Sequence, residues 1–334
     1  MRVELSTTYL GMELRHPIVA GASPLTGNLD SLRRLEQAGV SAVVLPSLFE
    51  EQIVQTELQL DALYEYYAGT FAESLTYFPE LREYNTGPRD YLKLLKLAKR
   101  SLSVPVIASL NGSSPGGWVR FAKQLEDAGA DAIELNVYFV PTDPRMSSEE
   151  VERRYADLVA FVKNAVSVPV AVKIGAQFSS LCHFARQLAD SGADGLVMFN
   201  RYLEPDINLN SLQITPHLVL STRNELRLPL RWIGILRDQT SMSLAASSGI
   251  HFPEDAVKLI LVGADICMMT SALFKHGVEY VTEMVREVEN WLEINDYVSI
   301  EQAKGSMSYS NCPDSGQLER ANYMKAITSY TPMR

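Results

Sequence analysis

A lysine and three asparagines stand at the ends of short apolar runs. Lys173 follows the apolar residues 170–172, so its stem begins inside a predicted strand. Burying an unpaired charge is costly, and this lysine therefore needs an anion or an acceptor-rich partner. An asparagine amide both donates and accepts hydrogen bonds, which suits the edge of a planar heterocycle. The three asparagines are Asn111, Asn136 and Asn200.

Small and hydroxylic residues end the remaining apolar runs. Where such a run precedes a helix, its backbone N–H groups and the positive end of the helix can bind a phosphate. A single Ser or Thr is more often only the N-cap of that helix, and an Asn more often forms a turn. A site is therefore predicted only if these residues converge. The set is Gly21, Ala22, Ser23, Ser47, Ser248, Gly249, Thr270 and Ser271.

One pattern occurs four times along the chain. An amphipathic run ends at a glycine, a small residue follows, and a short apolar strand comes next. Glycine just past a helix is a natural C-terminal cap, because it enters the left-handed conformation without steric cost. Each copy is half of a βαβ unit, which indicates a parallel sheet covered by helices. The copies lie around 30–47, 118–136, 182–200 and 253–271, with their caps at Gly39, Gly129, Gly192 and Gly263.

Complementary strands are predicted between these copies, at 16–24, 104–112, 168–176 and 243–248. The first residues, VELSTTYLGMELR, predict a hairpin that closes a barrel floor. We also predict a helix over 224–238, and a C-terminal helix over about 275–294 with a tail at 295–334. Eight strands alternating with helices predict an α/β fold, a (β/α)₈ TIM barrel, with a doubly wound open sheet as the alternative. In a barrel, the polar strand ends meet at one mouth.

Composition excludes several classes of function. The 334 residues carry 30 Lys+Arg against 40 Asp+Glu, a net charge of −10, which argues against nucleic acid or an anionic membrane as partner. No apolar run approaches the ~20 residues of a membrane helix, and the N-terminus lacks the apolar stretch of a signal peptide.

Cys182, Cys267 and Cys312 share no ligand spacing and indicate reduced thiols in the cytoplasm. The histidines are scattered, so no metal site is predicted. No linker divides residues 1–334, and we expect one domain.

The order of strand ends resembles the dihydroorotate dehydrogenase family, FMN-binding (β/α)₈ barrels that oxidise dihydropyrimidines. The similarity spans about 3–290. It rests on HPIVAGAS near the N-terminus, ELN at 134–136, VKI at 172–174, FN at 199–200, SSGI at 247–250 and GADICMMTSAL at 263–273. Each motif is weak alone, and together they are fairly specific.

The resemblance implies FMN as cofactor and a role for each matching residue. Lys173 would contact the isoalloxazine and stabilise its reduced, anionic form. Asn136 would lie beside flavin and substrate, and Asn200 would bind the substrate. The ends of strands seven and eight would hold the phosphate, while Ser47 would lie near the ring. The expected cofactor-binding residues are Gly21, Ala22, Ser47, Asn111, Asn136, Lys173, Ser248, Gly249, Thr270 and Ser271.

Two positions depart from the family pattern. After ELN the family carries a Cys or Ser base that takes a proton from substrate carbon 5, and Phe139 stands there instead. A phenyl ring cannot abstract a proton. Pro46 likewise replaces the lysine of strand two. Tyr138 would serve as acid or base if a cation lowered its pKa from about 10, or it packs with Phe139 beside the flavin. The expected catalytic residues are Lys173, Asn136, Asn200 and Tyr138.

Two further features have alternative interpretations. A long insertion after strand two, residues 48–92, is rich in acids and aromatics and is either a lid over the mouth or a dimer surface. Four arginines follow strand six, and three of them are spaced at helical i, i+4 intervals. They form either a solvated face or an anion site for substrate or phosphate. The four are Arg223, Arg227, Arg231 and Arg237.

Together these observations predict a cytoplasmic FMN-dependent oxidoreductase, with hydride transfer between flavin N5 and a small dihydropyrimidine-like or other unsaturated substrate. The alternatives are a flavin-binding subunit without dehydrogenation, and a barrel that binds another phosphorylated ligand without flavin. The chain has neither an iron–sulfur cysteine set nor a GxGxxG after a strand, so a redox partner chain would supply a cluster or nicotinamide. We expect a homodimer that acts on a small molecule, with neither nucleic acid nor membrane as partner.

Overall fold

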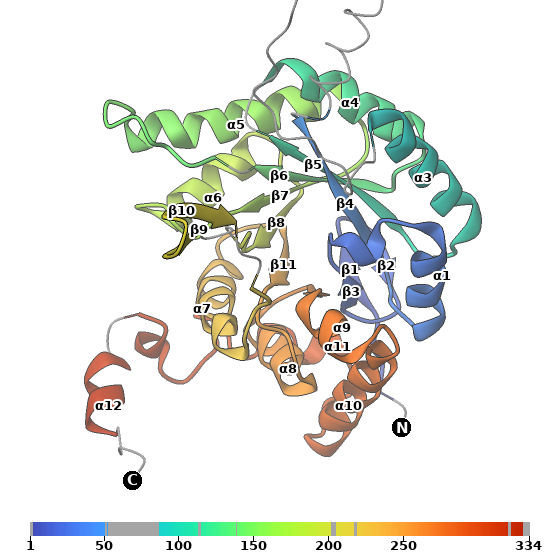
Figure 1. Ribbon diagram of the computed structural model, residues 1–334. Helices are drawn as coiled ribbons and strands as arrows, with labels where there is room; N and C mark the ends of the chain where they lie inside the picture. The colour runs from blue at the N-terminus through green and yellow to red at the C-terminus, as the bar shows by residue number, and fades with distance from the viewer. Residues whose placement is uncertain are drawn as a thin grey trace, which may run out of the picture.

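Eight parallel strands close into a barrel in the order β11-β12-β3-β4-β5-β6-β7-β8 (Figure 1). The computed structural model describes residues 3–50, 52, 87–112, 115–137, 139–201, 205–216, 219–319 and 322–329. The predicted (β/α)₈ barrel is confirmed, and the open sheet is excluded. The barrel strands are β3 Ile18–Ala20, β4 Val43–Phe49, β5 Val106–Gly112, β6 Ala132–Val137, β7 Val170–Ile174, β8 Gly195–Met198, β11 Ser243–Ser247 and β12 Ile266–Met269.

Helices cover the outside of this barrel, and their buried faces form the main hydrophobic core against the strands. The predicted seventh strand is confirmed as β11. The helix predicted over 224–238 is present as the 3₁₀ turn Arg223–Leu226 followed by α7. The helices are α1 Leu29–Ala38, α3 Pro88–Ser101, α4 Pro115–Asp127, α5 Ser148–Ala165, α6 Leu181–Asp190, α7 Arg227–Leu236, α8 Pro253–Val262, α9 Ser271–His276 and α10 Tyr280–Ile294.

The repeated glycine adopts the left-handed conformation that its position after each helix predicts. The φ angles are +102° at Gly39, +99° at Gly129, +95° at Gly192 and +118° at Gly263. A side chain at these positions would be strained, and the chain instead turns directly into the next strand. The sequence repeat is therefore a structural device that sets the angle between helix and strand.

In three of the four copies, an aspartate just after the glycine ties this turn to the preceding strand. Asp131 accepts the Val106 N–H at 2.7 Å, and Asp194 accepts the Val170 N–H at 2.7 Å. Lysines pair with both carboxylates, at 2.6 Å for Lys99 with Asp131 and 2.7 Å for Lys163 with Asp194.

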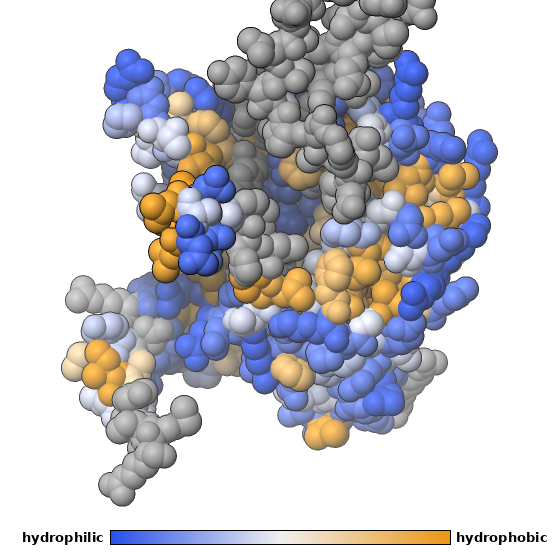
Figure 2. Space-filling model, viewed as in Figure 1, coloured by the Kyte–Doolittle hydropathy of each residue, from blue (hydrophilic) through white to orange (hydrophobic). Residues whose placement is uncertain are grey.

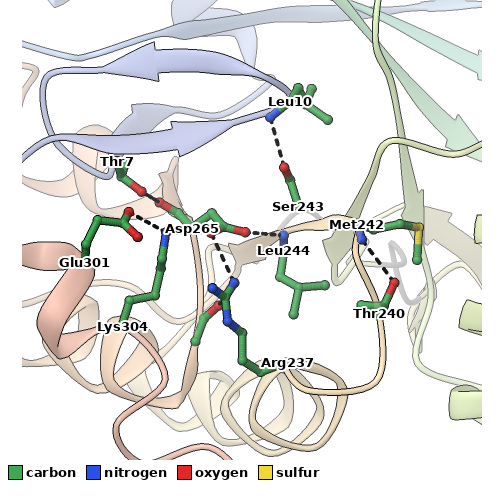
Figure 3. A network of polar contacts seen from close by, with 11 residues as sticks. Thr7, Leu10, Arg237, Thr240, Met242, Ser243, Leu244, Asp265, Glu301 and Lys304 are labelled. Carbon is green, nitrogen blue, oxygen red and sulfur yellow. Dashed lines mark hydrogen bonds and ion pairs between the residues drawn. The ribbon is translucent and has the colours of Figure 1, made fainter.

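The last copy, shown in Figure 3, is the most connected: Asp265 accepts the Leu244 N–H at 2.7 Å and pairs with Arg237 and Lys304, at 3.2 and 2.9 Å. Lys304 lies at the beginning of the predicted tail, so this part of the tail is bound to the barrel.

The N-terminal hairpin closes the barrel floor, as predicted. Strands β1 Thr7–Tyr9 and β2 Met12–Leu14 pair antiparallel. Tyr9 and Leu14 are buried among the side chains that fill the barrel interior. The Leu10 N–H donates to Ser243 Oγ at 3.0 Å, and Thr7 Oγ1 donates to the Asp265 carbonyl at 3.0 Å (Figure 3).

Three expectations about the connections need correction. The helix expected over 275–294 is two helices, because α9 ends at His276 and Gly277 has φ +87°. The end of the expected 48–92 insertion belongs to α3, which begins at Pro88, while 53–86 lie outside the described residues. An unpredicted hairpin, β9 Pro205–Asn208 with β10 Gln213–Pro216, follows β8. Beyond α10 lie the short elements α11 Ile300–Ala303, the 3₁₀ turn Ser315–Gln317 and α12 Asn322–Thr328.

The described part of the chain has no helix long and apolar enough to span a membrane. Within the same residues, no group of three or more His, Cys, Asp or Glu side chains is placed to hold a metal ion.

Candidate active site at the barrel mouth

A cavity of about 410 Å³ lies at the carboxyl ends of the barrel strands. Its wall combines apolar side chains with hydroxyls, amides and one lysine. The lining residues are Ala22, Ser23, Pro24, Ser47, Phe49, Asn136, Lys173, Phe199, Asn200, Arg201, Val219, Leu220, Ser221, Ser247, Ser248, Gly249, Ile250, Met268, Thr270, Ser271 and Phe274.

One group of polar side chains in this wall is a continuous hydrogen-bonded chain. Asn200 Nδ2 donates to Asn136 Oδ1 at 2.6 Å, and Asn136 Nδ2 donates to Ser47 Oγ at 3.2 Å. Ser47 Oγ lies 2.8 Å from Ser109 Oγ, which donates to Glu134 Oε1 at 3.5 Å. These residues come from the neighbouring strands β4, β5 and β6 and from the end of β8, so the barrel topology is what brings them together.

Lys173 and Glu134 form an ion pair beside this chain. Lys173 Nζ lies 3.8 Å from Glu134 Oε1, and the Glu134 side chain is only 1% exposed. The pairing explains how a charged lysine is accommodated at the end of β7. Tyr9 lies in the barrel interior within the field of Glu134. Burial, followed by the charges of Glu134 and Asp265, raises the pKa of Tyr9 well above 10, so its hydroxyl stays protonated.

A second group of polar side chains joins the loop before α7 to the ends of β11 and β12. The Ser221 N–H donates to Ser271 Oγ at 3.0 Å, and Ser221 Oγ lies 3.1 Å from His251 Nε2. Lys275 Nζ donates to the Ser221 carbonyl at 2.9 Å. Burial, and secondly the Lys275 charge, lower the pKa of His251. His251 and Lys275 therefore both contact Ser221 at this end of the site.

Two consecutive residues after β11 have left-handed backbone. Ser248 has φ +80° and Gly249 has φ +77°. A Cβ on Gly249 would lie 2.2 Å from the Leu226 backbone nitrogen, so only glycine allows the approach of the 3₁₀ turn. Successive N–H groups in such unusual backbone conformations form concave sites for anions.

Most of the predicted site residues do meet at this cavity. Gly21 and Asn111 do not line it. The Gly21 N–H is bonded to the Met269 carbonyl at 2.9 Å, and Asn111 is buried beside Asn136 in the β5–β6 ladder. Tyr138 lies outside the described residues. The residues brought together are Ala22, Ser47, Asn136, Lys173, Asn200, Ser248, Gly249, Thr270 and Ser271.

The two departures from the family pattern lie in packed parts of the barrel, Phe139 against the hydrophobic core and Pro46 within β4. The Phe139 ring packs against the core, half-buried, with the Arg154 guanidinium 5.0 Å from its centroid. Phe139 is not among the described residues that line the cavity. Pro46 lies in β4 where the register shifts between Val44 and Ser47. A proline is tolerated at such an irregularity because its missing N–H is not required there.

Several lining residues were not predicted from the sequence. Most of them are apolar, or reach the cavity from the loop between β8 and α7, and no local pattern distinguishes such residues from packing or loop residues. The residues that adjoin a predicted position did carry a signal, and these are Pro24, Phe199, Arg201, Ser247 and Ile250. The unpredicted residues are Pro24, Phe49, Phe199, Arg201, Val219, Leu220, Ser221, Ser247, Ile250, Met268 and Phe274.

The four arginines after strand six divide into two roles. Arg223 pairs with Asp255 at 2.6 Å, and Arg237 pairs with Asp265, so both stabilise the fold. Arg227 and Arg231 instead line a second cavity of about 820 Å³, which shares Asn200 and other residues with the first. Arg223, Arg227 and Arg231 are all exposed, which fits the solvated face, and the position of Arg227 and Arg231 at this cavity fits the anion site.

A closed parallel barrel with a polar-lined cavity at its carboxyl-terminal mouth is the arrangement of the barrel enzymes. The sequence model described as dihydroorotate dehydrogenase matches residues 83–292. This chain therefore belongs to the dihydroorotate dehydrogenase family.

Curated relatives agree with this family. A putative dihydroorotate dehydrogenase A (fumarate) of Aeropyrum pernix is 27% identical over 227 residues, covering 66% of this chain and 73% of that protein. The catalytic subunit of dihydroorotate dehydrogenase B (NAD(+)) of Thermoplasma acidophilum is 25% identical over 314 residues, covering 90% and 98%. The NAD-dependent dihydropyrimidine dehydrogenase subunit PreA of Escherichia coli K12 is 22% identical over 340 residues, covering 95% and 80%.

Proposed function

We propose that this chain is an FMN-dependent oxidoreductase of the dihydroorotate dehydrogenase-like type. It would act on the CH–CH bond of a small dihydropyrimidine-like or other unsaturated substrate. The observation that carries the proposal is the barrel-mouth cavity, where a lysine and two amides form one polar group and hydroxyls form another. The dehydrogenase names of the relatives support the same reaction class.

The size and lining of the cavity support flavin binding. Its volume of about 410 Å³ is within the usual range of small-molecule sites. Apolar side chains would contact the ring faces, and Lys173 would supply a positive charge near the ring. The phosphate would be held by the backbone of 248–249 and by hydroxyls of the second polar group. Those hydroxyls belong to Ser221, Thr270 and Ser271.

When bound, FMN supplies hydride transfer at its N5 atom. Lys173 would stabilise negative charge that develops on the bound ring, by Coulomb attraction in a site with little water. Asn136 and Asn200 would orient the substrate through hydrogen bonds, which lowers the entropy cost of reaching a reactive geometry.

The proton-transfer residue differs from the one that the family resemblance implies. Phe139 cannot act as a base, so we expect dihydroorotate to be a poor substrate, slower by about 10²–10⁴-fold than with a positioned base. Tyr138 is the candidate acid or base for a different substrate. Removing its hydroxyl in Tyr138→Phe should then abolish turnover while FMN remains bound.

We further propose that electrons pass to or from a second protein chain, that the protein acts in the cytoplasm, and that it forms a homodimer. Two relatives are named as subunits, and both names include NAD. The free thiols of Cys182, Cys267 and Cys312 are compatible with a reducing compartment.

Absorbance of the purified protein tests the proposal. A yellow protein, or one that takes up added FMN stoichiometrically, is expected. A colourless protein that binds no FMN would contradict it and favour a barrel for another phosphorylated ligand. Photoreduction followed by reoxidation with a panel of unsaturated substrates then separates an enzyme from a flavin-binding subunit. Fast turnover of dihydroorotate would overturn the interpretation of Phe139.

A further inference from the structure

Glu134 is a buried carboxylate that the proposed reaction does not use. It lies on β6 two residues before Asn136, and its side chain therefore points to the same side of the strand. One oxygen, Oε1, accepts from Ser109 at 3.5 Å and lies 3.8 Å from Lys173 Nζ. The other oxygen, Oε2, is buried without a hydrogen-bond partner among the described residues. A carboxylate in such surroundings costs stability, so its position calls for an explanation.

The hydrogen-bond chain that ends at Glu134 has a direction. An ionised carboxylate accepts hydrogen bonds and donates none. The Ser109 hydroxyl therefore donates its hydrogen bond to Glu134, and the Ser109 oxygen accepts a hydrogen bond from the Ser47 hydroxyl. Ser47 Oγ in turn accepts from Asn136 Nδ2, which leaves Asn136 Oδ1 to accept from Asn200 Nδ2. Every donor along the chain points toward Glu134.

We propose that Glu134 is the positioning residue of this site: it fixes the direction of the chain, and through it the orientation of both amides. Lys173 pairs with this carboxylate, and a carboxylate offers no donor that would reverse the chain. Hydrogen bonds that share one direction polarise and strengthen one another, which makes the arrangement rigid. Glu134 itself is buried beneath the cavity and does not line it.

This direction specifies the ligand group that Asn200 recognises. One Nδ2 hydrogen of Asn200 is donated to Asn136, which fixes the orientation of the amide and therefore the position of its carbonyl Oδ1. A group that faces this oxygen must carry an N–H or O–H donor, as the ring N–H of a cyclic amide or pyrimidine does. This step rests on the proposed function, because it assumes that the substrate lies against Asn200.

A double-mutant cycle on the purified protein tests the chain without any ligand. Glu134→Gln introduces an amide that can also donate, so the direction is no longer enforced. Asn200→Ala removes the amide at the opposite end of the hydrogen-bond chain. We expect Asn200→Ala to change the unfolding equilibrium constant less in the Glu134→Gln background, by more than about twofold, which exceeds the non-additivity of independent sites. Additive effects would overturn the proposal.

The matched control is Glu152→Gln, which alters a buried carboxylate on α5 away from the cavity. Its effect should add to that of Asn200→Ala. If Glu134→Gln does not fold, Ser109→Ala removes the hydrogen bond between Ser109 and Glu134 while leaving Glu134 in place. The cycle of Ser109→Ala with Asn200→Ala should then show the same coupling, and additivity there would equally refute the chain.

Ligand selectivity of the FMN-loaded protein tests the donor assignment. Binding of uracil and of 1,3-dimethyluracil is followed by the change in flavin absorbance. Uracil should bind about tenfold tighter or more, because the dimethyl compound leaves a buried acceptor unpaired, and Glu134→Gln should reduce this preference. Equal affinities would overturn the assignment. If neither compound binds, the proposed substrate class is wrong, and the cycle still decides the role of Glu134.

Discussion

At the scale of single residues, the barrel mouth contains a buried ion pair and a glycine with no space for a side chain. Lys173 is the one described lysine that lines the cavity, and Glu134 alone among described residues forms an ion pair with it. No hydrogen bond joins the Lys173 ammonium to a described protein atom, so its donors remain available to a ligand. Gly249 matters for a different reason, because the backbone of another turn occupies the space of a side chain.

Replacing Lys173 should affect flavin binding or flavin reduction. We expect Lys173→Met to weaken FMN binding or slow flavin reduction by about tenfold or more, because a nearby positive charge stabilises negative charge by this amount. FMN titration and stopped-flow reduction measure the two effects. Lys96→Met, on the exposed face of α3, serves as the control. Identical behaviour of the two variants would exclude a role for Lys173 in flavin binding.

Substitution of Gly249 should destabilise the protein through a steric clash. Gly249→Ala places a Cβ 2.2 Å from the Leu226 nitrogen, in a backbone conformation that already disfavours alanine. We expect a loss of about 3 kcal/mol or more in urea unfolding. Gly11→Ala separates the two causes, since Gly11 has φ +75° but no atom within 4 Å of the added Cβ. That variant should lose only about 1 kcal/mol; equal losses would show that the clash is relieved.

At the scale of elements, an aspartate two residues after the glycine binds three of the four helix–glycine–strand units to the preceding strand. Asp131, Asp194 and Asp265 each accept the N–H of the preceding strand and pair with a basic side chain. In the first copy Ser41 takes this position, and its hydroxyl donates to the Ile18 carbonyl at 2.8 Å. These hydrogen bonds and ion pairs therefore stabilise the units at the amino-terminal ends of the strands. The site lies at the opposite, carboxyl-terminal ends.

Loss of one of these aspartates should weaken the fold. Asp194→Ala removes the acceptor of the Val170 N–H and the partner of Lys163, and we expect a cost of about 2 kcal/mol, as for a hydrogen bond to a charged group. Asp127→Ala is the control, because Asp127 is exposed and its nearest lysine is 3.6 Å away. It should change stability by less than about 0.5 kcal/mol. Equal effects in urea unfolding would contradict the proposed stabilisation.

At the scale of the whole molecule, the two ends of the barrel differ in character. The floor is packed and bonded by the N-terminal hairpin, while the mouth holds the cavity and the unpredicted β9–β10 hairpin (Figure 1). Apolar side chains gather over that hairpin in Figure 2, and Leu209 and Leu212 are 80% and 82% exposed.

Acid should destabilise the molecule through His16 at the floor. His16 Nδ1 accepts the Ile18 N–H at 3.2 Å, and Nε2 donates to the Gly39 carbonyl at 2.7 Å, so the ring is bound in its neutral form. Burial is the main cause that lowers its pKa to about 4. The unfolded chain, with a pKa near 6.5, binds a proton first as the pH falls. Stability should therefore be complete above about pH 6.5 and decline by about 3 kcal/mol toward pH 4.

Thermal unfolding between pH 8 and pH 4 measures this dependence. His16→Gln should flatten the profile across that window, although it also lowers stability at neutral pH. His183→Gln changes an exposed imidazole on α6 and should leave the profile as it is. A profile that keeps its slope without His16 would assign the acid sensitivity to other groups.

The sequence by itself determined the barrel and most of the polar residues that line the cavity. Glycine caps, apolar strands and the residues at their ends are local patterns, and a barrel topology converts local strand ends into one mouth. That is why Asn136, Lys173, Asn200 and Thr270 could be assigned to a common site before the fold was known. The family resemblance added the expectation of a cofactor and of a substrate class, which no local pattern contains.

Only the tertiary structure decided the contacts between residues distant in sequence. The directed chain from Asn200 to Glu134 crosses neighbouring strands, and its hydrogen bonds exist only once the barrel is closed in register. The loop that brings Ser221 to Ser271, and the approach of Leu226 to Gly249, likewise depend on packing. Distances between side chains are set by many weak contacts between residues far apart in the sequence. The pattern of apolar residues along the chain indicates only which residues of a helix or strand are buried.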